Sequence, residues 1–103
     1  MSNGNRILVV MYDLASGEHR AAQDFFETNV PSRWIRAQRS VILAQTPMKA
    51  EELVLRFVSF LTVRFEREFT PTNQVLAFEI TDSEYCGHLD GDVLRWLERV
   101  RAM

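Results

Sequence analysis

Five consecutive apolar residues, Ile7 to Met11, restrict the possible folds of this chain more than any other feature. A strand that is apolar on both sides must be covered on both faces of its sheet. We therefore predict a buried strand over Arg6–Leu14, with other elements packed on either side of it. The run is far shorter than the ~20 residues that span a bilayer, and no small-residue cleavage site follows it, so we expect no membrane association.

The spacing of apolar residues predicts six further elements. Helices are expected at 18–30, from Thr46-Pro47 (with Thr46 as the cap and Pro47 in the first turn) to about residue 65, and at 90–103. Strands are expected in two parts of 33–46, joined around Gln38-Arg39, and at 74–81. Residues 62–69 fit an extended segment as well as a helix, because their apolar residues partly alternate.

The predicted order is strand, helix, strand, strand, helix, strand, helix. The first six elements form the split β-α-β pattern, which predicts an α+β, ferredoxin-like βαββαβ sandwich with an additional C-terminal helix. The 103 residues suffice for one core, so we expect a single domain over 1–103, frayed at 1–5. In this topology the first and third strands are central, and the fourth flanks the first.

That topology brings polar residues together at one end of the sheet. Asp13 ends the first strand, and Arg39 and Ser40 precede the third, so these residues meet beside His19 and Arg20 at the start of the first helix. Asp13 has two interpretations: it caps the following turn, or it binds Mg²⁺ or Mn²⁺. Because one carboxylate binds Mg²⁺ poorly, the second interpretation needs a dimer that pairs two copies of Asp13.

Two segments resemble a known family. Ile7–Leu14, an apolar run ending in Tyr-Asp and an aliphatic residue, resembles the first strand of the small CRISPR-associated ferredoxin-fold nucleases of the adaptation complex. The segment 38–42 is similar to the family's Gln-x-Ser-Val-aromatic sequence, with Ile42 in the aromatic position. Residues 34–53 resemble the SinR-like relatives, which share a Trp-bearing second strand, an apolar third strand ending in Thr, and a helix soon afterwards.

The resemblance implies a homodimer and, in some members, metal-dependent cleavage of phosphodiesters. By position, Asp13 matches the metal ligand, Tyr12 is its neighbour, and Ser40 matches the serine that opens the third strand; these three form the implied catalytic set. Besides Ile42 in the aromatic position, the chain departs from the family in two places. Relatives with nuclease activity carry paired basic residues soon after the Asp, where this chain has only Arg20, and a helix replaces their additional C-terminal strand.

Two functions follow from these expectations. The first is a dimeric module of a defence or mobile-element system that binds nucleic acid or a protein partner, with Arg20, Arg36 and Arg39 on the nucleic acid. The alternative is a divalent-metal-dependent endoribonuclease or deoxyribonuclease that uses Asp13. A net charge of −2 excludes coating of nucleic acid by bulk attraction but leaves room for a local basic patch. The single cysteine, Cys86, cannot form an internal disulfide, so a cytoplasmic location is expected.

The arginines of the second strand also have an alternative role. Arg33, Arg36 and Arg39 are three residues apart, and on a regular strand this spacing alternates between the two faces. They could therefore pair separately with Glu51 and Glu52 instead of forming one phosphate site.

The remaining candidates favour structural roles. Residues that alternate at 82–88 could reach a metal ion from one face of an extended chain, but an exposed polar edge is the favoured interpretation; they are Asp82, Glu84, Cys86 and His88. His19 is expected to be a solvated residue of the first helical turn rather than a general base. Core positions are expected for five aromatic residues: Phe25, Phe26, Phe57, Phe60 and Trp96.

Overall fold

The computed structural model describes residues 5–14, 19–31, 33–65, 74–81 and 91–101, and in this part it confirms the α+β class and the predicted element order. The elements are β1 (Arg6–Asp13), α1 (His19–Asn29), β2 (Trp34–Gln38), β3 (Val41–Thr46), α2 (Ala50–Phe65), β4 (Gln74–Glu79) and α3 (Gly91–Arg101). None of the described helices combines the length and the apolarity needed to cross a bilayer.

The four strands form one antiparallel sheet in the order β2-β3-β1-β4. β1 runs between β3 and β4, as the apolar run at its centre predicts. Its register with β3 goes from Arg6 opposite Thr46 to Met11 opposite Val41. Because β3 and β4 both run antiparallel to β1, the end of β1 lies beside the starts of both neighbours.

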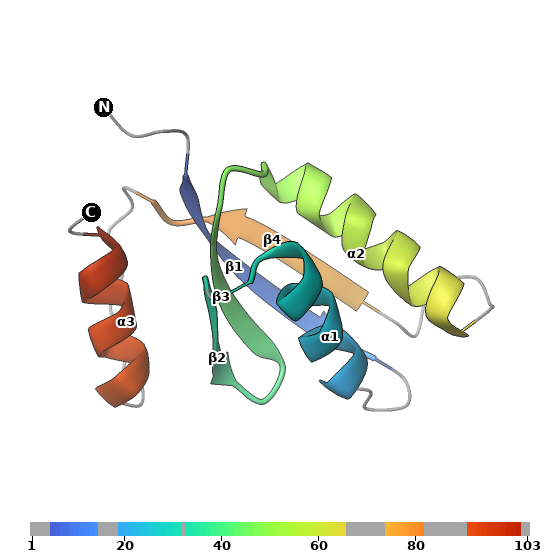
Figure 1. Cartoon of the computed structure of the whole chain (residues 1–103), viewed down its shortest axis with the longest axis horizontal. Helices are drawn as coiled ribbons and strands as arrows, with labels where there is room; N and C mark the ends of the chain where they lie inside the picture. The colour runs from blue at the N-terminus through green and yellow to red at the C-terminus, as the bar shows by residue number, and fades with distance from the viewer. Residues whose placement is uncertain (1–4, 15–18, 32, 66–73, 82–90, 102–103) are drawn as a thin grey trace.

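One face of β1 is covered along the strand and the other only over its first part, which confirms in part the main expectation from its sequence. Leu8, Val10 and Tyr12 are buried in one core with residues of α1 and α2. Ile7 points to the opposite face and is buried in a second core with residues of α3. Figure 1 shows α1 and α2 on one side of the sheet and α3 apart from them. The larger core contains a cluster of aromatic rings around Phe57.

α3 covers only part of its face of the sheet. Trp96 is buried against Ile7 and Leu43, as expected for a packed tryptophan. Farther along the same face, apolar side chains of β1 and β4 remain in solvent: Met11 is 42% exposed, Leu76 57% and Phe78 42%. Met11 and Leu76 are directly opposite each other in the strand pairing, so these residues are contiguous. We call Met11, Leu76 and Phe78 the uncovered sheet face.

Two boundary predictions need correction. Thr46 does not cap α2, because it is the last residue of β3 and pairs with Arg6. Its hydroxyl accepts a hydrogen bond from the Met48 backbone N–H at 3.1 Å, and the helix begins only at Ala50. At the other end, α2 continues to Phe65, so the extended alternative is wrong for residues 62–65. The rest of that segment lies outside the described residues.

Candidate functional site

The Tyr12 hydroxyl is the centre of a polar cluster at one end of the sheet. The ring is buried among the residues under α1 and α2, with 4% of the residue exposed. Its hydroxyl accepts a hydrogen bond from Arg36, lies 3.2 Å from His19 Nδ1, and can donate to the Arg39 carbonyl at 3.3 Å. The Tyr12 backbone N–H donates to the Ser40 carbonyl at 3.0 Å. One side chain thus connects β1, α1 and the β2–β3 turn.

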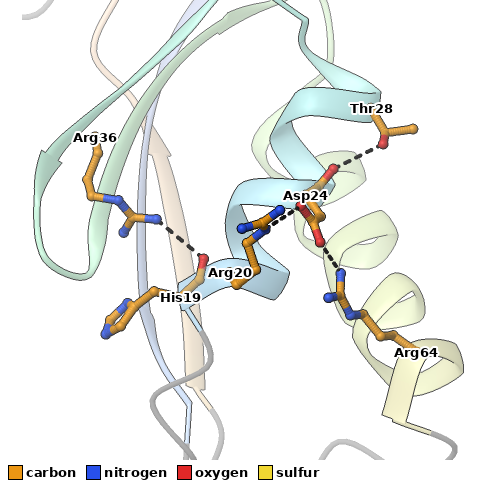
Figure 2. A network of polar contacts seen from close by, with 6 residues as sticks. All are labelled: His19, Arg20, Asp24, Thr28, Arg36 and Arg64. Atoms are coloured by element: carbon orange, nitrogen blue, oxygen red, sulfur yellow. Dashed lines mark hydrogen bonds and ion pairs between the residues drawn. The ribbon is translucent and has the colours of Figure 1, made fainter.

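Arg36 holds the same three segments together through its guanidinium. Besides the Tyr12 hydroxyl, Nη1 donates to the Arg39 carbonyl at 2.6 Å, and Nη2 donates to the His19 carbonyl at 3.4 Å (Figure 2). The guanidinium carbon also lies 6.0 Å from the centre of the Tyr12 ring, within the range of a cation–π contact. All of these acceptors are uncharged, so the positive charge of Arg36 is not neutralised there.

Arg39 is the more accessible cation of the cluster. The residue is exposed, and its Nε donates to His19 Nε2 at 3.3 Å. No ion pair of Arg36 or Arg39 with a carboxylate occurs among the described residues, and Glu52 pairs instead with Arg56 at 3.0 Å. The cluster therefore carries two positive charges without a carboxylate partner in this part of the chain.

The expectation that the strand-two arginines point to opposite faces is wrong for Arg36 and Arg39. The pairing of β2 with β3 shifts by one residue between Arg36 and Gln38, which is the signature of a β-bulge. The turn then follows at once, at Arg39 and Ser40. Bulge and turn together return Arg39 to the side of Arg36, so both reach His19.

Arg20 belongs to a different group of charges. Its Nε lies 3.3 Å from Asp24 Oδ1, and Arg64 of α2 lies 2.5 Å from Asp24 Oδ2. Figure 2 shows Arg20 turned toward Asp24 and the His19 ring turned away from it. Asp24 thus connects α1 to α2, and Arg20 does not join the cluster around Tyr12.

The pKa of Asp24 is lowered, mainly by the hydrogen bond from Arg64, to which Arg20 adds while partial burial opposes. A lowered pKa in the folded state means that the carboxylate stabilises the fold when it is ionised. This contribution is complete above the unfolded pKa of about 4, and it is lost as the pH falls through the lowered value.

Asp13 lies apart from the cluster. Side chains alternate along β1, and Asp13 is exposed on the face opposite Tyr12, where it pairs with Gln74 of β4. Its carboxylate makes no hydrogen bond or ion pair within the described residues, so no contact with Arg39 is seen there, and the turn that Asp13 was expected to cap lies outside them. Ser40 shares only a backbone hydrogen bond with Tyr12. The predicted convergence therefore brings together His19, Arg39 and Tyr12, but not Asp13.

The described residues do not surround Asp13 with a set of metal ligands. Among the described residues, no three His, Cys, Asp or Glu side chains lie together as ligands of a metal ion. Mg²⁺ requires further carboxylate or phosphate oxygens besides one carboxylate. The alternating series at 82–88 lies outside the described residues.

The role of His19 was missed from the sequence. It was expected to be solvated, but it is half-buried, with its ring centre 5.7 Å from that of Tyr12 and both ring nitrogens in polar contacts. The available signal was Tyr12 itself, because a tyrosine that ends a buried strand face needs a partner for its hydroxyl.

Comparison of the chain with protein-family models, with curated proteins and with solved structures found no match. The family resemblance noted in the sequence therefore stays a prediction, and the functional argument rests on the geometry of the cluster.

Proposed function

We propose that this chain is a homodimeric, ferredoxin-like protein that binds nucleic acid through its phosphates, in a defence or mobile-element system. The strand order β2-β3-β1-β4 supports the ferredoxin-like arrangement, because it places the first and third strands in the centre. The location of α1 and α2 on one face of the sheet supports it as well. The biological setting rests on the sequence resemblance.

One observation carries the binding function: the guanidinium groups of Arg36 and Arg39 meet at His19 without a carboxylate partner among the described residues. Arginine binds phosphate through paired N–H groups, and it keeps its charge at every physiological pH. Arg36 is engaged by three acceptors and positions the turn, whereas Arg39 is exposed and makes one side-chain contact. Arg39 is therefore the residue that we assign to the phosphate.

The nearby helix start favours the same ligand. α1 begins at His19, and no acidic residue occupies its first turn. The unpaired N–H groups at the start of a helix favour an anion. Arg36 and Arg39 both contact His19, the first residue of this helix. A protein partner with an acidic surface is the competing possibility, and the oligonucleotide-binding experiment below tests nucleic acid against it.

Arg39→Ala is expected to weaken binding of single-stranded RNA or DNA about fivefold to tenfold and to reduce the slope of log K against log salt by about 0.7 to 0.9. The reason is the loss of one phosphate contact. The measurement is fluorescence anisotropy with labelled single-stranded RNA, single-stranded DNA and duplex DNA at several salt concentrations.

The matched control is Arg99→Ala, which removes one exposed positive charge from α3 on the other face of the sheet. It is expected to change affinity less than twofold. Wild-type protein that binds none of the three oligonucleotides, or equal losses in the two variants, would contradict the proposed site.

The dimer proposal is supported by the uncovered sheet face, where Leu76 and Phe78 of the edge strand β4 are exposed. Open apolar edges of this kind are a liability unless a partner covers them. We expect light scattering after size-exclusion chromatography to give about twice the 12.0 kDa of the chain. The Phe78→Glu variant should be a monomer, because a dimer would bury two glutamate carboxylates, one from each chain, in the interface.

Leu55→Glu is the control for this prediction, since Leu55 is 61% exposed on α2, away from the proposed interface. That variant should remain dimeric. A wild-type monomer at tens of micromolar, or a Phe78→Glu dimer, would exclude this interface. The metal-dependent nuclease alternative also depends on this dimer, because Asp13 lies on the same face and belongs to no group of three metal ligands among the described residues.

A further inference from the structure

The contacts of His19 define its protonation state. Arg39 Nε lies 3.3 Å from His19 Nε2, and an arginine can only donate, so Nε2 must accept the hydrogen bond. The proton of the neutral ring is then on Nδ1, which donates to the Tyr12 hydroxyl at 3.2 Å. The hydroxyl can donate its own hydrogen bond to the Arg39 carbonyl at 3.3 Å. Every donor in this network has an acceptor only when His19 is neutral.

A second proton on His19 is incompatible with this arrangement. Nε2–H would face the N–H of Arg39, so two donors and two positive charges would oppose each other. The groups that face His19 are Tyr12 from β1, Arg36 from β2 and Arg39 from the turn, with Arg20 adjacent on α1. No carboxylate contacts the imidazole within the described residues, so nothing in this part of the chain would compensate the new charge.

We propose that His19 is a proton switch for phosphate binding: the neutral ring holds Arg39 against the protein, and the protonated ring releases Arg39 and adds a third positive charge to those of Arg36 and Arg39. This inference rests on the proposed function, since it concerns the same phosphate site. It predicts tighter binding as the pH falls. By linkage, a bound phosphate favours the protonated ring to the same extent.

The experiment measures the affinity for the labelled single strand that binds best, at constant salt, at several pH values from about 5.5 to 8. The wild type is expected to bind about fivefold to tenfold tighter at the acidic end, the effect of about one additional phosphate contact. His19→Gln should change less than twofold, because its amide oxygen can still accept from Arg39 but cannot take up the proton. His88→Gln, which removes the other histidine of the chain, should behave as the wild type.

A second measurement needs neither a variant nor a ligand. Nitrogen chemical shifts of the His19 ring in the wild-type protein should show the Nδ1-protonated tautomer at the alkaline end. The Arg39 Nε–H signal should move as the ring takes up its proton. Finding the Nε2-protonated tautomer at the alkaline end, or an Arg39 Nε–H signal that does not move as the pH is lowered, overturns the switch.

The outcomes separate this inference from the function on which it rests. Binding with the same pH dependence in wild type and His19→Gln overturns the switch and leaves nucleic-acid binding in place. No binding by the wild type at any pH overturns the proposed function, and the switch with it.

Discussion

Replacing Phe57 by alanine is expected to lower the free energy of unfolding by about 3–5 kcal/mol, the range for a fully buried phenylalanine. Phe57 is fully buried, and its ring stacks on that of Phe25 with their centres 4.8 Å apart. It also makes edge contacts with Phe26 and Tyr12 at 5.7 and 6.0 Å. Alanine leaves a cavity among rings that cannot all move into it, because helix and sheet hold them separately.

The measurement is urea unfolding, supported by a thermal melt in which the midpoint falls by about 15–25 °C. Leu55→Ala on the same helix is the control, since Leu55 is 61% exposed and its loss should stay within about 0.5 kcal/mol. If Phe57→Ala does not fold, Phe57→Leu should still lose about 1–2 kcal/mol. A Phe57→Ala variant as stable as Leu55→Ala would mean that α2 does not pack on the sheet through this residue.

The core could be predicted because burial leaves a periodic signal. The apolar run from Ile7 to Met11 predicted cover on both faces. The helices α1 and α2 supply it on one side, and α3 supplies it on the other side except at Met11. Phe25, Phe26 and Phe57 are buried at the helical spacing that predicted them. Boundaries were less accurate where a residue serves two elements, as Thr46 pairs in β3 and also accepts a hydrogen bond in the turn that follows.

The polar cluster was only partly predictable, for two physical reasons. Topology alone placed Asp13, His19 and Arg39 at one end of the sheet, but strand alternation puts Asp13 on the other face from the cluster. A bulge next to Arg36 also changes which side chains meet, and no glycine or asparagine in the sequence marks it. The contact between Arg39 and His19 follows the bulge and the turn after it, so residue spacing did not indicate it.

Arg36→Met is expected to lower the free energy of unfolding by about 2–4 kcal/mol, because methionine keeps much of the side-chain length but none of the donors. The guanidinium donates to the Tyr12 hydroxyl and to the carbonyls of Arg39 and His19. Hydrogen bonds from a charged donor contribute more than neutral ones, but these three share one group and do not add in full. The variant should leave the β2–β3 turn less firmly attached to α1.

Arg33→Met is the matched control, since Arg33 lies just before β2, is exposed and makes no side-chain hydrogen bond or ion pair within the described residues. Both variants lose one positive charge, but only Arg36→Met loses hydrogen bonds to three acceptors. The free energy of unfolding of Arg33→Met should therefore stay within about 0.5 kcal/mol of that of the wild type. Urea unfolding at neutral pH measures both. Equal stabilities would mean that Arg36 is a surface charge rather than the group that positions the turn, and phosphate binding would then have to be assigned to Arg36 together with Arg39.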